Sequence, residues 1–217
     1  MRRLLALLFA LGLCYSAPAA ADIIVLDFEG AGNQAQLLNF YNGGTDSQGH
    51  SGVDFGIQFG ANALSIIDAD AGGTGNIANE PSPSTVPFFL SGTAILNFEP
   101  GFDTGFSFFY TSSTTATVNV YDGLNALGNL LGTITLAAQF SQNCVGDPNG
   151  QFCNWTPIGV SFLGIARSID FGGTVNQTAY DNITFGSATP GDNVAEPATL
   201  ALLGLGLAGL AFWRRRS

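Results

Sequence analysis

The sequence predicts an all-β protein whose body is an antiparallel β-sandwich of the jelly-roll type, flanked by an N-terminal signal peptide and a single C-terminal membrane helix. Two observations predict the sandwich. Apolar and polar residues alternate with a period of two in many short segments, which is the pattern of a strand with one buried face. Turn sequences separate these segments, and the chain of 217 residues contains 29 glycines and 18 phenylalanines. This balance favours short strands over long amphipathic helices.

Nine or ten strands are expected. The clearest alternation lies in residues 116–121, and turn sequences such as Asp122-Gly123 end the strands. The segment 71–87 is rich in Gly, Asn, Ser and Pro and is expected to be a long surface loop. In chain order, the expected strands are residues 23–28, 53–59, 64–67, 93–98, 105–110, 116–121, 133–136, 157–162, 168–171 and 182–185.

The chain divides into four parts: a signal peptide (1–21), a β-sandwich domain (22–186), a short linker (187–193) and a sorting and anchor segment (194–217). The body has roughly 170 residues, which is the size of one domain. Strands of this number and length pack most simply as two antiparallel sheets. A closed barrel is the alternative architecture.

The charge distribution excludes one class of partner. The chain has no lysine, and Arg167 is the only arginine between Asp22 and Asp192, a range that contains all but one of the 16 Asp and Glu residues. Non-specific nucleic-acid binding needs several Lys or Arg side chains to displace counterions. We therefore expect no nucleic-acid partner, whereas an acidic surface favours hard divalent cations such as Ca²⁺.

The N-terminus has the pattern of an export signal. Arg2 and Arg3 precede an apolar run at residues 4–13, and small residues follow it. The arginines favour the cytoplasmic side, and the run is too short to serve as a mature membrane anchor. Ala19 and Ala21 form the A-x-A site at which we expect the signal peptide to be cleaved.

The C-terminus predicts a membrane helix. Residues 198–213 carry no charge. As a helix they reach about 24 Å, slightly less than the ~30 Å hydrocarbon core of a bilayer. The arginines that follow would hold the C-terminus in the cytoplasm and leave the body outside. The expected anchor residues are Leu200, Leu203, Gly204, Leu207, Leu210, Trp213, Arg214, Arg215 and Arg216.

Directly before this segment stand Val194, Ala195, Glu196 and Pro197. Together with the Leu/Gly-rich stretch and the arginine cluster, they resemble the PEP-CTERM family, in which Pro-Glu-Pro precedes a short membrane segment. Ala195 replaces the first proline of that signature. The resemblance implies export, membrane retention of an inner-membrane precursor, and cleavage near Glu196 and Pro197 by a membrane transpeptidase, an exosortase. The mature protein is then expected at the cell surface or outside the cell.

The body is similar to the lectin-like sandwich that is common among substrates of this sorting system. The resemblance supports the jelly-roll prediction and carries no binding residues with it. It rests on residues 101–108, 118–123, 168–173 and 181–186.

Cys144 and Cys153 bracket a polar, turn-rich insert, and Cys14 is lost with the signal peptide. In an exported chain the remaining pair is expected to form a disulfide that contributes about 2–3 kcal/mol. Two free thiols or a metal pair are the alternative.

Carboxylates at strand ends give the best metal hypothesis. Asp27 and Glu29 close the first expected strand, and Asp181 opens the last. If these strands are antiparallel neighbours, Glu29 and Asp181 meet at one edge and could bind Ca²⁺, with Asn33 or Asn42 adding neutral oxygens. The alternative is that all of them are solvated turn residues.

No catalytic residue is predicted. His50, the only histidine, lies in Gly49-His50-Ser51-Gly52, which does not match a nucleophile elbow, so we expect a loop histidine. Aromatic side chains could stack on sugars or complete the core. These aromatic residues are Tyr41, Tyr110, Tyr121 and Trp155.

The sequence therefore predicts a non-catalytic surface or matrix protein that binds or organises extracellular polysaccharide. Two alternatives stay open: a secreted carbohydrate-active hydrolase that uses an unrecognised carboxylate pair, and a purely structural matrix protein. The expected partners are an exosortase-type transpeptidase, the membrane and extracellular polysaccharide. Ca²⁺ is the one candidate cofactor.

Overall fold

The computed structural model describes residues 23–141 and 150–191, which form eleven strands and no α-helix. Every strand pair is antiparallel, so the predicted all-β antiparallel class is confirmed. The strands are β1 (Ile24–Leu26), β2 (Ile57–Phe59), β3 (Ala63–Ile67), β4 (Thr85–Phe89), β5 (Ala94–Phe102), β6 (Gly105–Ser112), β7 (Ala116–Tyr121), β8 (Leu130–Leu136), β9 (Thr156–Ser161), β10 (Ala166–Phe171) and β11 (Thr178–Phe185).

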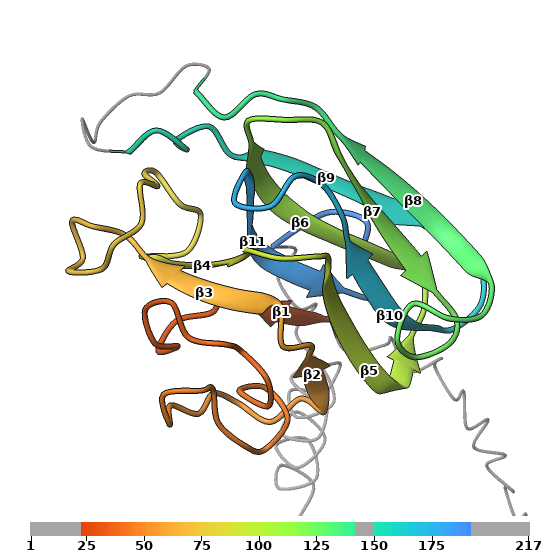
Figure 1. Cartoon of the computed structure of the whole chain (residues 1–217). Helices are drawn as coiled ribbons and strands as arrows, with labels where there is room; N and C mark the ends of the chain where they lie inside the picture. Colours follow the sequence, from red (N-terminus) through yellow and green to blue (C-terminus); the bar gives the residue numbers. More distant parts are fainter. Residues whose placement is uncertain (1–22, 142–149, 192–217) are drawn as a thin grey trace, which may run out of the picture.

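The strands form a four-stranded sheet, a five-stranded sheet and a two-stranded hairpin (Figure 1). The four-stranded sheet has the order β1-β11-β6-β9, and the five-stranded sheet has the order β2-β5-β10-β7-β8. Strands β3 and β4 form the hairpin, and β4 packs against β11. Two packed open sheets make a sandwich, so the closed-barrel alternative is wrong.

No helix in the described ranges is long and apolar enough to cross a membrane. The predicted C-terminal helix lies outside these ranges.

Aromatic rings fill the space between the two sheets. Phe106 and Phe108 of β6 are fully buried, and both rings lie 6.1 Å from that of Phe171 in β10. Phe102 of β5 meets Phe185 of β11 edge to face at 4.9 Å. Such pairs contribute about 0.5–1.5 kcal/mol each beyond the burial of their area. The period-two alternation that predicts these strands thus places their rings in a single core.

The prediction of a surface loop at residues 71–87 is wrong at its C-terminal end. Residues Thr85–Phe89 form β4, and all five are buried. Pro87 is tolerated because its register partner Ser65 donates its backbone N–H to Ala35, away from β4. The pair Ser65–Pro87 is therefore a position of the ladder without hydrogen bonds, where the missing proline N–H costs nothing.

Tyr180 of β11 carries a buried hydroxyl in this apolar core. Its side chain is 2 % exposed, and its ring packs at 4.7 Å from that of Phe171. The hydroxyl has no hydrogen-bond partner among the described residues. Burial raises the pKa of Tyr180 far above its usual range, and the negative charge of Asp170 adds to the effect. The phenol therefore stays neutral, and its buried hydroxyl, which has no hydrogen-bond partner among the described residues, lowers the stability of the fold.

Tyr180→Phe is expected to raise the free energy of unfolding by about 1 kcal/mol, because it removes an unsatisfied polar group without changing the shape of the ring. Urea denaturation followed by circular dichroism measures the change. Tyr41→Phe is the matched control: the Tyr41 hydroxyl accepts the N–H of Phe28 at 2.7 Å, so its removal should cost about 1–2 kcal/mol. A clear loss of stability in Tyr180→Phe would contradict the assignment of an unpaired hydroxyl.

Candidate functional site

Several predicted site residues lie outside the described ranges. They are the signal-cleavage residues Ala19 and Ala21, Cys144, and the tail at residues 194–217. Cys153, the predicted disulfide partner of Cys144, is buried. The disulfide and the signal cleavage stay predictions.

Asp181 holds a segment that is far from it in the sequence. Its side chain is fully buried on β11, which is an antiparallel neighbour of β1 as predicted. Its Oδ2 accepts the N–H of Ser82 at 2.7 Å, and its Oδ1 accepts the Ser82 hydroxyl at 2.8 Å and the N–H of Asn182 at 2.7 Å. The carboxylate therefore fixes Ser82 to the sheet.

Glu29, just beyond β1, fixes the next residues of the same segment. Its Oε1 accepts the N–H of Ser84 at 3.0 Å and that of Thr85 at 2.8 Å, and its Oε2 accepts the Ser84 hydroxyl at 3.2 Å. We call residues 82–85 the stapled segment. The segment leads directly into β4, so two carboxylates position the hairpin on the four-stranded sheet.

Burial raises the pKa of Asp181 to about 7, and the negative charge of Glu29 acts in the same direction. The hydrogen bonds from Ser82 and Asn182 oppose this rise but do not cancel it. Desolvation dominates because the carboxylate is taken out of water with no cation beside it among the described residues.

The predicted calcium ligands are not all brought together. Glu29 and Asp181 are close, but Asn33 accepts the N–H of Ile67 at 3.1 Å, and Asn42 lines a separate groove. Within the described ranges, no group of three or more His, Cys, Asp or Glu side chains could hold a metal ion. Calcium binding stays a prediction, while the termini of the sandwich are joined here by hydrogen bonds to the stapled segment.

His50 is paired with a buried aspartate. Its Nδ1 lies 3.0 Å from Oδ2 of Asp46, whose side chain is fully buried. Desolvation alone would raise the pKa of Asp46, but hydrogen bonds from the N–H groups of Gly32, His50 and Gln48, and from the His50 ring, outweigh it and lower the pKa. Asp46 thus ties residues 32–50 together, and His50 has the loop position that the sequence predicts.

The four candidate aromatic residues divide into two groups. Tyr41 and Tyr110 are buried at 3 % exposure each, and both belong to the main core. Trp155 is partly buried, and its Nε1 donates to the carbonyl of Ala78 at 2.9 Å. Tyr121 is also partly buried, on the outer face of β7. The core interpretation therefore holds for Tyr41 and Tyr110.

A polar groove crosses the outer face of the five-stranded sheet. Its floor comes from Gln58 on β2 and from Asn97 and Glu99 on β5, and Gln58 and Asn97 are register partners. The groove consists of two hollows of about 200 and 550 Å³ that share Glu99, Leu124 and Asn125. We call it the outer groove. Its lining residues are Asn42, Gly56, Gln58, Asn97, Glu99, Gly123, Leu124, Asn125, Leu127 and Arg167.

The loop between β7 and β8 folds over this face and forms one wall of the groove. Asn97 accepts the N–H of Asn125 at 2.7 Å and donates its own amide to Asn125 Oδ1 at 2.9 Å. Ser168 of β10 accepts the N–H of Ala126 at 2.9 Å. Asn125 and Ala126 both have positive φ angles of 58°. This local strain is held by the contacts to the sheet, so the wall is preorganised.

The outer groove offers free hydrogen-bonding groups beside apolar ones. Arg167 is the only Lys or Arg side chain in the described ranges and forms no ion pair with another described residue. Gln58 donates its amide to Asn39 at 3.1 Å, which leaves Oε1 as an acceptor. Leu124 and Leu127 are 36 % and 66 % exposed. Sequence reasoning missed this site because its residues are common surface types from segments far apart in the chain.

Fold and site thus define an all-β sandwich protein with a preformed polar groove. A comparison with protein families shows how the protein is sorted. Residues 193–216 match the PEP-CTERM protein-sorting motif. This confirms the predicted resemblance in the tail. The motif indicates an exported protein that is processed at the membrane by an exosortase.

Two solved structures resemble the body. The first is a glycoside hydrolase family 43 arabinoxylan arabinofuranohydrolase from Bacillus subtilis in complex with cellotetraose. This match has a TM-score of 0.39 and 17% sequence identity. It covers 59% of this chain and 25% of that chain. The second is a family 6 carbohydrate-binding module, with a TM-score of 0.35, 14% identity, and coverage of 50% of this chain and 79% of that chain. No curated protein sequence matches the chain.

Proposed function

We propose that the protein is a non-catalytic surface or matrix protein that binds extracellular polysaccharide in the outer groove. The observation that carries the proposal is the preorganised wall. The loop after β7 is fixed by Asn97 and Ser168 before any ligand arrives. Binding to a preformed site avoids the entropy cost of ordering a loop.

The chemistry of the outer groove suits sugar rings. A sugar presents hydroxyl groups at its edge and C–H groups on its faces. Glu99, Gln58 and Arg167 can pair with hydroxyls, whereas Leu124 and Leu127 can cover C–H faces. The larger hollow, about 550 Å³, lies within the range of about 300–1,000 Å³ that is typical of ligand sites.

The charge of the chain favours a glycan over other extended polymers. The formal net charge is −10, which repels nucleic acids and other strongly anionic chains. A neutral or weakly charged polysaccharide does not meet this barrier. Export by the sorting system brings the body to the side of the membrane where such polymers lie.

Arg167→Gln is expected to weaken polysaccharide binding about tenfold, because a charge-assisted hydrogen bond is worth roughly 1.5–3 kcal/mol. Glu99→Gln should give a similar loss. The full chain in detergent is tested by affinity electrophoresis through gels that contain neutral or uronate-bearing polysaccharides. Asp70→Asn, which changes an exposed carboxylate away from the groove, is the control. Relative to its own mobility in a gel without polysaccharide, it should be retarded as strongly as the wild type.

Two outcomes would contradict the proposal. If neither groove variant changes binding to a polysaccharide that retards the wild type, the site lies elsewhere. If the wild type releases reducing sugar from that polysaccharide, and a groove carboxylate variant abolishes the release, the protein is a hydrolase and not a binding protein.

A further inference from the structure

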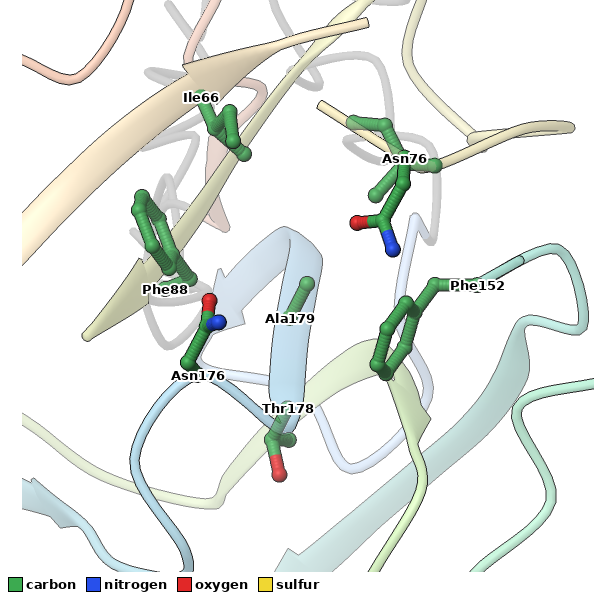
Figure 2. Close-up of a pocket in the computed structure, with 8 residues that line it drawn as sticks. Ile66, Asn76, Phe88, Phe152, Asn176, Thr178 and Ala179 are labelled. Carbon is green, nitrogen blue, oxygen red and sulfur yellow. The ribbon is translucent and has the colours of Figure 1, made fainter. Parts of the chain in front are cut away.

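A second pocket lies away from the outer groove, where the hairpin meets β11 (Figure 2). It encloses about 30 Å³. Because about 10–15 Å³ of such space holds one water-sized group, the pocket has room for roughly two. Its lining residues are Ile66, Asn76, Ile77, Phe88, Phe152, Asn176, Thr178 and Ala179.

The inner part of this pocket is apolar. Ile77, Phe88 and Ala179 are buried at 3 %, 7 % and 5 % exposure and form a small separate core with Val86. Figure 2 shows Phe88 and Phe152 on opposite sides of the space, with Ala179 between them. A methyl group would gain contacts with these apolar side chains, whereas a water molecule would find few partners beside them.

Two amides stand at the rim of the apolar space. The side-chain amides of Asn76 and Asn176 point toward the space between the two phenylalanine rings (Figure 2). The described residues provide no hydrogen-bond partner for either side-chain amide. Each amide offers a carbonyl acceptor and an NH₂ donor. The rim can thus both donate to a ligand carbonyl and accept from a ligand N–H.

Hydrogen bonds fix the main chain at both asparagines. The carbonyl of Asn76 accepts the N–H of Gln151 at 2.8 Å and that of Phe152 at 3.0 Å. Asn176 has a φ of 57°, and its N–H donates to the carbonyl of Phe89 at 2.8 Å. Asparagine tolerates this left-handed conformation better than most residues. The main-chain positions of both rim residues are therefore fixed before a ligand binds.

We propose that this pocket binds the acetamido group of an N-acetylated sugar. The acetyl methyl enters the apolar space between Phe88 and Phe152, and the amide of the ligand pairs with Asn76 and Asn176. An acetamido group combines one methyl with one carbonyl and one N–H, which is the set that this pocket complements. The site is distinct from the outer groove and gives the body a second glycan contact.

Saturation-transfer NMR on the full chain in detergent tests the proposal with N-acetylglucosamine and glucose as matched probes. The acetyl methyl protons should receive the strongest saturation, with a dissociation constant of about 1 mM, as expected for a small ligand. Glucose should show no comparable signal. Equal signals from both sugars, or no transfer to the acetyl methyl at about 10 mM ligand, would overturn the proposal.

Variants separate this site from the outer groove. Asn176→Ala and Asn76→Ala should each weaken binding of N-acetylglucosamine about tenfold by removing a hydrogen-bonding pair. Asn119→Ala, on the outer face of β7, is the matched control and should bind normally. Arg167→Gln should bind polysaccharide about tenfold more weakly and keep the acetyl methyl signal, so a failure of either site is distinguishable. Unchanged affinity in both rim variants would refute the assignment.

Discussion

Replacing Asp181 by alanine is expected to lower the free energy of unfolding by about 3 kcal/mol at pH 6. The change leaves the N–H groups of Ser82 and Asn182 and the Ser82 hydroxyl without their acceptor. Each buried unsatisfied donor costs about 1–3 kcal/mol. Relief from burying a polar carboxyl group, most of which is protonated at pH 6 because its pKa is about 7, offsets part of this loss. The stapled segment should loosen first.

Urea denaturation gives the size of this loss, and limited proteolysis within residues 82–85 reports the local opening. Asp54→Ala is the matched control. Asp54 is exposed, and among the described residues it accepts only the N–H of Gly56, two residues away. Its removal should therefore change stability by less than about 0.5 kcal/mol. A loss below about 1 kcal/mol in Asp181→Ala would mean that the two carboxylates do not determine the position of the hairpin.

The second prediction concerns pH. The free energy of unfolding of the wild-type protein is expected to fall by about 2 kcal/mol between pH 5 and pH 8. The pKa of Asp181 is raised to about 7 in the folded protein, whereas an unfolded aspartate titrates near ~3.9. Between these values the folded chain binds more protons than the unfolded chain, so stability falls as the pH rises. Below about pH 4 both states are protonated, and this dependence ends.

Comparison with Asp181→Asn isolates this group, because all other titrating residues are common to both proteins. The wild type should lose stability from pH 5 to pH 8 by about 2 kcal/mol more than the variant. Asp46, whose pKa is lowered, contributes stability that is lost only as the pH falls below about 4, outside this window. Identical pH profiles for the two proteins would show that Asp181 is ionised throughout.

The sequence was sufficient to predict most of the strands. The ten expected segments all overlap observed strands, and several of them, such as residues 116–121, carry the alternation that buries one face. β4 was missed because Pro87 and the preceding polar residues have the composition of a loop. Its place in the fold depends on Ser65, whose N–H bonds to Ala35 and frees that register position for a proline.

The site was predictable only in part. The proximity of Glu29 and Asp181 follows from antiparallel pairing of the first and last strands, which the structure contains. Their hydrogen-bond partners could not be predicted, since Ser82 is 99 residues from Asp181. The outer groove could not be predicted for the same reason. The order of strands in the sheet brings together Gln58, Asn97 and Arg167, and no local spacing in the sequence indicates that order.

The last strand of the body is not at an edge of its sheet. β11 lies between β1 and β6, and its residues pair with both. In an exported chain, this order sets the timing of folding. The four-stranded sheet cannot be completed until residue 185 has crossed the membrane, because β1 and β6 have no shared neighbour before β11 arrives.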